Sequence, residues 1–222
     1  MDTALKALKA RPGPAPVSRW LMSPAAKPLL FLLALLPLAR LVLGAFTETL
    51  GPNPAEALIR GTGDWTLRLL CLTLAVTPLR QWTGWHALAR LRRMLGLFTF
   101  FYGVLHFLCF AWLDQGFELD AILIDITKRP FILVGTAALL LMLPLAATSL
   151  NRAIKAMGAA RWQALHRAVY AVALLALLHF FWMRAGKNDF AEWTLYALVL
   201  GLLLGWRLKR RYFMKPGSHS AN

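Results

Sequence analysis

Apolar residues are concentrated in six separate stretches of the chain, each close to twenty residues long. The stretches cover residues 28–46, 63–80, 93–113, 130–149, 162–183 and 190–208. About twenty mostly apolar residues in a helix cross the hydrocarbon core of a bilayer. The alternating pattern of barrel strands is absent, and only helices and closed barrels satisfy their backbone groups in lipid. The pattern therefore predicts six transmembrane helices.

These elements predict an all-α integral membrane protein, a six-transmembrane helix bundle, in three parts. A basic N-terminal segment covers residues 1–27, the helical domain covers 28–208, and a short basic tail covers 209–222. We expect the first apolar stretch to be a retained helix, although the small residues Gly44 and Ala45 leave signal-peptide cleavage open. The tail is too short for a nucleotide-binding domain, so redox chemistry would need an electron donor from another molecule.

Composition and charge place this bundle in a membrane. Of the 222 residues 59% are hydrophobic, which is more apolar surface than a soluble domain of this size can bury. The net charge of +15 indicates contact with membrane lipid rather than nucleic acid, because basic residues collect in cytoplasmic loops. The termini and loops predicted on one face of the membrane carry seventeen lysines and arginines, whereas the loops on the other face carry five. Both termini are therefore predicted to be cytoplasmic.

The two cysteines, Cys71 and Cys109, both lie inside predicted spans. At these positions we expect them to pack as small buried apolar residues, and not to form a disulfide framework. The sequence contains no C-x-x-C-H motif, so it gives no support for covalent attachment of a c-type haem. Any haem would be held without a covalent bond, as in b-type cytochromes.

Three histidines, His106, His166 and His179, lie inside apolar stretches. An imidazole is costly to place in hydrocarbon, so histidines inside a span indicate a functional site. At 1.5 Å per residue, His106 lies roughly 18 Å and His179 roughly 24 Å beyond the inner ends of their spans. His166 lies only about 5 Å from the inner end of its span. Two imidazoles at similar depth on separate helices are typical of bis-histidine haem ligation in a bundle. The pattern predicts a membrane cytochrome with an outer haem between His106 and His179.

A second, inner haem at His166 is predicted with less support. On an ideal helix His166 and His179 point about 140° apart, so both face haem only from different flanks or on a distorted helix. No histidine stands near the inner start of the third span, where Met94 could ligate iron or simply pack. An inner haem could also be five-coordinate. We expect His86 and His219 to be surface residues.

Arginines inside the spans are candidate partners of haem propionates. Arg68 and Arg40 fall in the outer halves of the second and first spans. Arginine binds carboxylates through two parallel hydrogen bonds, and this pairing is strong in a low-dielectric environment. The alternative for both is that the side chain extends to the membrane interface, which is also the favoured interpretation for Arg167.

Three segments around these residues resemble the MsrQ family, the haem-binding membrane subunits of periplasmic methionine sulfoxide reductase systems. They are residues 92–97 (RRMLGL) leading to Leu105 and His106, residues 161–166 (RWQALH) with Val169 and Tyr170, and residues 178–180 (LHF) with Trp182. The resemblance extends from about residue 28 to residue 211.

This resemblance implies a ferric-reductase-like transmembrane domain in the bacterial inner membrane, with one or two b-type haems and an associated FMN. It implies electron transfer from the quinone pool, or from a cytosolic flavin reductase, to a periplasmic molybdopterin-containing methionine sulfoxide reductase subunit. His106, His166 and His179 would take the family's iron-ligand roles. The wider group of ferric reductases and NADPH oxidases has two histidines on the third span, whereas this chain has one.

Two other functions remain open. A ferric or cupric ion reductase would use the same haem core without a protein partner. A small-solute or proton transporter would use the intramembrane histidines and arginines as a path and would contain no haem. The acidic residues between Asp114 and Asp125 could dock a partner or form a solvated loop.

Overall fold

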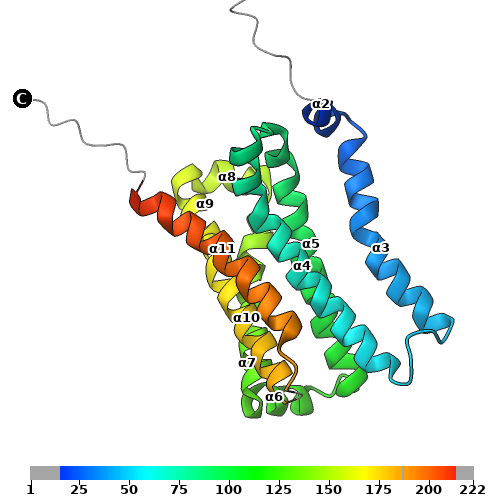
Figure 1. The fold of residues 1–222 in the computed structure, drawn as a ribbon. Coiled ribbons are helices and arrows are strands. Elements are labelled where there is room, and N and C mark those ends of the chain that lie inside the picture. The colour runs from blue at the N-terminus through cyan, green and yellow to red at the C-terminus, as the bar shows by residue number, and fades with distance from the viewer. Residues whose placement is uncertain (1–15, 187, 214–222) are drawn as a thin grey trace, which may run out of the picture.

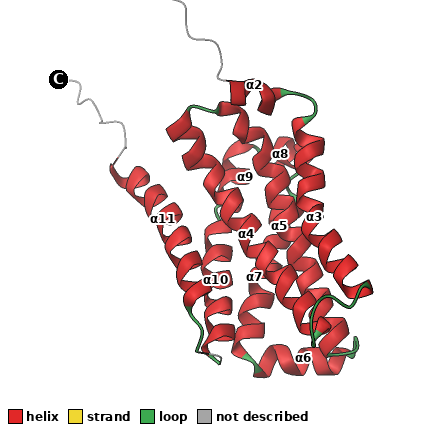
Figure 2. Ribbon diagram, turned by 45° about the vertical axis from the view of Figure 1, so that its right-hand side comes forward, coloured by secondary structure: helices red, strands yellow, loops and turns green. Residues whose placement is uncertain are grey.

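All secondary structure in the computed structural model, which describes residues 16–186 and 188–213, is helical (Figures 1 and 2). The helices are α2 (Pro16–Met22), α3 (Ala26–Phe46), α4 (Pro54–Thr83), α5 (Ala89–Cys109), α6 (Leu119–Lys128), α7 (Pro130–Ala147), α8 (Asn151–Met157), α9 (Ala159–His166), α10 (Val169–Ala185) and α11 (Ala191–Phe213). A 3-10 turn, His86–Leu88, precedes α5, and a π-helical turn, Phe110–Asp114, continues it. The predicted all-α class is confirmed.

Five helical segments are long and apolar enough to cross a membrane, and each corresponds to a predicted stretch. They are Ala26–Phe46, His86–Asp114, Pro130–Ala147, Ala159–Ala185 and Ala191–Arg211. Large apolar side chains remain exposed on their outer faces, as lipid-facing surfaces require. The chain is a multi-pass membrane protein.

Helix α4 contains the remaining predicted stretch, 63–80, but it is longer and more polar than the other spans. It begins where Asn53 accepts a hydrogen bond from the backbone N–H of Glu56 (3.1 Å), and it ends at Gly84 with a left-handed φ of 72°. Its 30 residues reach about 45 Å, more than a bilayer core requires. Its charged residues keep it out of the apolar set, so the count of six spans depends on α4.

The fifth predicted stretch is not one regular helix. Helices α9 and α10 are separated by Arg167 and Ala168. The backbone tightens there, because the N–H of Ala168 donates to the carbonyl of Leu165, only three residues back (2.9 Å). The ideal-helix estimate that His166 and His179 point about 140° apart therefore does not apply.

Two antiparallel helix pairs, α4 with α5 and α7 with α10, form the centre of the bundle (Figure 1). Leu70, Leu74, Val172 and Leu200 are buried in one apolar cluster that joins α4, α10 and α11. A second cluster joins α3 to α4 and α5, and Met94 packs against it. Met94 therefore occupies a packing position, one of the two alternatives expected for it.

Helix α3 is held at the edge of the bundle by Tyr102 of α5 (Figure 1). The fully buried Tyr102 hydroxyl donates to the carbonyl of Ala34 (2.7 Å) and accepts from the N–H of Leu38 (3.1 Å). In a regular helix these two backbone groups bond to each other. The hydroxyl is thus inserted into the hydrogen-bond ladder of α3 beside Pro37, as side chains do at helix distortions.

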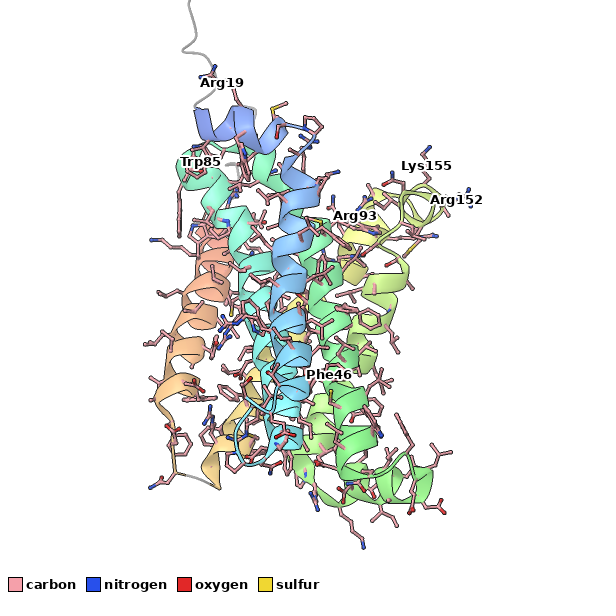
Figure 3. The ribbon with its side chains drawn as sticks, turned by 90° about the vertical axis from the view of Figure 1, so that its right-hand side faces the viewer. Arg19, Phe46, Trp85, Arg93, Arg152 and Lys155 are labelled. Atoms are coloured by element: carbon pink, nitrogen blue, oxygen red, sulfur yellow. The ribbon has the colours of Figure 1, made fainter. Side chains whose placement is uncertain are left out.

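Charged residues are sorted between the two ends of the bundle. Figure 3 shows Arg19, Arg93, Arg152 and Lys155 toward the same end. Helix α6, which carries acidic residues, lies at the opposite end (Figure 1). This sorting agrees with the charge asymmetry of the sequence, and the cytoplasmic location of the basic end stays a prediction. Several residues used in that count and in the terminal segments lie outside the described part of the chain: Lys6, Lys9, Arg11, Lys187, Lys215 and His219.

Candidate functional site

His106 of α5 and His179 of α10 lie side by side in the centre of the bundle. Their ring centroids are 6.0 Å apart and their ring planes are inclined by 77°. The two residues are 73 positions apart in the chain and come from different helix pairs. The structure therefore brings together the two imidazoles that were predicted to lie at similar depth.

Each imidazole is held through its Nδ1 atom by a backbone carbonyl. His106 Nδ1 lies 2.8 Å from the carbonyl oxygen of Ile59, and His179 Nδ1 lies 2.6 Å from that of Phe131. A carbonyl can only accept, so each Nδ1 carries the proton and donates it. In a neutral imidazole the lone pair then resides on Nε2, the usual arrangement of a metal-binding histidine.

A cavity of about 220 Å³ lies between α4, α5, α7 and α10 and is lined by both histidines. Most of its wall is apolar, and three glycines, Gly63, Gly103 and Gly135, contribute to it. At Gly63 and Gly135 the missing side chain leaves room for the histidine rings themselves, which lie directly against these two glycines. Apolar walls with a few placed polar groups are typical of cofactor sites.

The spacing of the histidines fits one metal ion between them. Because a metal–imidazole bond is about 2 Å long, two imidazoles on opposite sides of one ion have centroids roughly 6 Å apart. The observed 6.0 Å corresponds to this arrangement. Two imidazoles at this spacing would be able to hold the iron of a haem.

Comparison with known proteins identifies the family. The family model "Ferric reductase like transmembrane component" matches residues 62–177, just over half of the chain. The chain is 63% identical over 190 residues to the protein-methionine-sulfoxide reductase haem-binding subunit MsrQ of Polaromonas naphthalenivorans, covering 86% of this chain and 87% of that protein. The chain belongs to the MsrQ family.

Other MsrQ proteins are similar over most of their length. The subunit from Azospira oryzae is 56% identical, covering 84% of this chain and 80% of its own. The subunit from Xanthomonas campestris pv. campestris is 47% identical, covering 74% of each chain. No solved structure matches the chain. The ferric-reductase-like match includes His106 and His166 and ends shortly before His179.

The two arginines predicted as propionate partners from their positions inside the spans, Arg68 and Arg40, do not line the cavity of the histidine pair. Arg68 is not among the residues that line the cavity; its Nε donates to the hydroxyl of Tyr196 (3.1 Å), and its guanidinium lies 5.0 Å from the ring centroid of Trp65. Arg40 is exposed on the peripheral helix α3. The structure does not bring either one to the histidines, and their role as propionate partners stays a prediction.

Two other arginines, Arg60 and Arg129, do line the cavity, although the sequence did not single them out as candidates. Arg60 forms an ion pair with Glu56, and Arg129 pairs with Asp125 (3.3 Å). Arg60 lies in the first turns of α4 and Arg129 directly precedes α7, so their positions near the helix ends could be predicted from the sequence, but not that they face the cavity. The Arg60–Glu56 pair is partly exposed, whereas Asp125 is mostly buried and also accepts a hydrogen bond from Gln115 (2.8 Å).

His166 lies outside this cavity, at the end of α9. Its ring stacks on Trp162 with 3.9 Å between centroids, and its Nδ1 donates to the carbonyl of Trp162 (3.0 Å). Its buried Nε2 has no hydrogen-bond partner among the described residues. The structure therefore does not join His166 to the pair formed by His106 and His179. His86 is exposed, as expected.

A second cavity, of about 660 Å³, lies toward the basic end of the bundle. Its wall includes five arginines and Tyr170, and the arginines are Arg92, Arg167, Arg207, Arg210 and Arg211. Arg207 crosses from α11 to α4, where its Nη2 donates to the carbonyl of Leu74, and its guanidinium lies 5.8 Å from the Tyr170 ring centroid. Such a concentration of positive charge attracts anionic groups.

Proposed function

We propose that this chain is the haem-carrying electron-transfer subunit of a methionine sulfoxide reductase system. The observation that carries the proposal is the pair of imidazoles with centroids 6.0 Å apart, each with Nδ1 bound to a carbonyl and Nε2 left for a metal. Relatives that cover most of the chain are named haem-binding subunits of this reductase. The chain itself would carry electrons and would not contain the reductase active site.

His106 and His179 would hold the outer haem through their Nε2 atoms, and this haem would supply a one-electron Fe(III)/Fe(II) couple. The carbonyls of Ile59 and Phe131 orient the two rings and increase the basicity of their Nε2 atoms. The apolar wall excludes water and keeps the ligand set fixed. Rigid ligation lowers the structural change that accompanies electron transfer.

Arginines at the cavity would balance the charge of the haem propionates. Arg60 and Arg129 line the cavity and are the nearest candidates. Arg68 remains a candidate because Asp64, one helical turn before it, also lines the cavity. Arg40 remains a candidate from the sequence only. A guanidinium beside a carboxylate in an apolar environment forms a strong, directed pair.

The route across the membrane would run from the basic end to the histidine pair. We propose six spans with both termini cytoplasmic and the chain in the bacterial inner membrane. An inner haem near His166 would lie roughly 20 Å from His179 along the fifth span, so two cofactors would divide the membrane into two steps. The Nε2 of His166, which makes no hydrogen bond by distance and angle among the described residues, would be the ligand atom there.

The two ends of the route would meet different molecules. The donor, a quinone or a cytosolic flavin reductase, and an associated FMN would act at the basic end, where the second cavity concentrates arginines. The acceptor would be a periplasmic molybdopterin-containing subunit that reduces methionine sulfoxide. Asp120, exposed on α6 at the opposite end, and the acidic residues near it would dock it.

The test is a dithionite-reduced minus oxidised absorption spectrum of the purified chain, with haem counted per chain. Wild-type protein is expected to show a b-type spectrum, and His179→Ala is expected to lose the signal of the outer haem. His86→Ala is the matched control, because His86 is exposed and distant from the cavity. A normal haem spectrum in His179→Ala would refute the ligand assignment. A colourless wild-type protein would favour the transporter.

A further inference from the structure

The two candidate haem ligands are held by the same arrangement on two different helices. Ile59, whose carbonyl accepts from His106, lies four residues before Gly63 on α4. Phe131, whose carbonyl accepts from His179, lies four residues before Gly135 on α7. In each case the glycine is also in direct contact with the histidine ring, so one carbonyl and one glycine hold each imidazole.

The contacts at the glycines leave no room for a side chain. A Cβ atom at Gly63 would lie 3.0 Å from Cε1 and 3.1 Å from Nδ1 of His106. A Cβ atom at Gly135 would lie 2.8 Å from Nδ1 and 3.0 Å from Cε1 of His179. Real Cβ atoms are rarely this close to a ring, so each imidazole lies where an ordinary residue would have its side chain.

Helix geometry explains why a glycine stands four residues after the accepting carbonyl. In an α-helix the carbonyl of residue i is directed at the N–H of residue i+4, so the side chain at i+4 covers that carbonyl. Without a Cβ at Gly63 or Gly135, the oxygen is open to a second donor from a neighbouring helix. The imidazole N–H takes that place.

The two arrangements have nearly the same spacing along the chain. His106 lies 47 residues after Ile59, and His179 lies 48 residues after Phe131. Helices α4 and α7 both run toward the end that carries α8, and α5 and α10 both run back (Figure 1). Both histidines stand in a Leu-His-Phe triplet, at 105–107 and 178–180. The pairs α4/α5 and α7/α10 thus run in the same directions, and each carries an accepting carbonyl, a glycine and a Leu-His-Phe triplet in that order.

We propose that the core of this chain is an internal repeat of two helix pairs, and that Gly63 and Gly135 are equivalent positioning residues that fix the histidine rings for iron. The proposal rests on the proposed function, since it assigns the glycines a role toward the haem ligands. The glycines do not touch the metal. They act through the imidazoles, by exposing the carbonyls that hold Nδ1 and leave Nε2 for ligation.

Alanine substitutions test this role because alanine favours a helix more than glycine does. Gly63→Ala and Gly135→Ala therefore place a methyl group against the ring without weakening the helix itself. Gly96→Ala is the matched control, since a Cβ at Gly96 on α5 meets only a methyl group of Thr73, at an ordinary 3.7 Å. The full-length chain is purified with its haem, and the ferric spectrum and the haem content are measured.

We expect Gly96→Ala to keep the low-spin, six-coordinate spectrum of the wild type. Gly63→Ala and Gly135→Ala are expected to give a high-spin spectrum and to weaken haem binding about 10- to 100-fold, as loss of a ligand's supporting contacts does. The larger loss is expected at Gly135, where the contact is shorter (2.8 Å against 3.0 Å). Added imidazole should restore the low-spin spectrum in both variants, because the haem site remains and only the ligand ring is displaced.

A second comparison covers the case in which Gly135→Ala fails to accumulate. The methyl group clashes with His179, so the double variant Gly135→Ala/His179→Ala should be as stable as His179→Ala alone. Coupling between two contacting residues is what such a cycle measures. A double variant as unstable as Gly135→Ala would overturn the proposal, and so would a wild-type spectrum and haem content in both glycine variants.

Failure of the proposed function has a different signature. A wild-type chain that binds no haem would refute the cytochrome assignment, whatever the glycine variants do. The stability cycle between Gly135 and His179 would then still decide whether the glycine positions the ring.

Discussion

Arg207 is expected to stabilise α4 at the point where Pro78 interrupts its hydrogen-bond ladder. The carbonyl of Leu74 would normally accept from the N–H of residue 78, but proline has no N–H to donate. Arg207 of α11 donates its Nη2 to this carbonyl. Polar side chains of neighbouring helices commonly satisfy backbone groups that proline leaves open in membrane proteins. Substitution of Arg207 by methionine removes this donor while keeping a long apolar side chain.

The size of the effect follows from the burial of the acceptor. Leu74 is only 1% exposed, and a buried carbonyl without a donor costs about 1–3 kcal/mol. We expect Arg207→Met to lower the free energy of unfolding by about 2 kcal/mol, a shift of roughly 4–8 °C in Tm for a chain of this length. The matched control is Arg210→Met, because Arg210 also lines the second cavity but is exposed, and no hydrogen bond from it to α4 occurs within residues 16–186 and 188–213 as the structure describes them.

The decisive assay repeats Arg207→Met in a Pro78→Ala background, with thermal unfolding of detergent-solubilised protein as the readout. Alanine at position 78 supplies the missing N–H, so most of the cost of Arg207→Met should disappear there. Contacting groups that share one hydrogen bond are coupled by more than about 0.5 kcal/mol. An equal cost of Arg207→Met in both backgrounds would refute the reasoning.

Three further results are expected from the histidine site. Neutralising Arg60 or Arg129 with glutamine should lower the haem midpoint potential, because removal of a nearby positive charge favours the ferric state; potentiometric titration checks this, and an unchanged potential in both variants would exclude them as propionate partners. The ring planes of His106 and His179, inclined by 77°, should give a strongly anisotropic low-spin EPR signal, whereas the rhombic signal of parallel rings would contradict the geometry. His166→Ala should leave the outer haem spectrum intact and remove only a second haem, so loss of the outer signal would show that His166 belongs to that site.

The helices themselves could be predicted from the sequence because hydrophobicity is a local property. Five predicted stretches coincide with helices that can span a membrane, and residues 63–80 lie within α4. The break at Arg167 and Ala168 could not be predicted, since neither residue is a glycine or a proline. It arises from a three-residue backbone bond that depends on how α9 and α10 pack.

The histidine pair could be predicted in outline, whereas its supports could not. His106 and His179 could be paired from the sequence because the helical rise per residue converts a position in the chain into a depth in the membrane. The carbonyls of Ile59 and Phe131 carry no sequence signal, since every residue has one. The cavity arginines were passed over because a sequence gives depth but not direction around the bundle axis.

Helix α3 is separate from the part of the bundle that lines the two cavities. Among the described residues, α3 lines neither cavity, and the ferric-reductase-like match begins only at residue 62. It is joined to the core by the hydroxyl of Tyr102, which bonds to its backbone, and by apolar packing against α4 and α5. An engineer could therefore replace α3 by another apolar helix, or by the last helix of a fused membrane protein, without changing the cavity that His106 and His179 line.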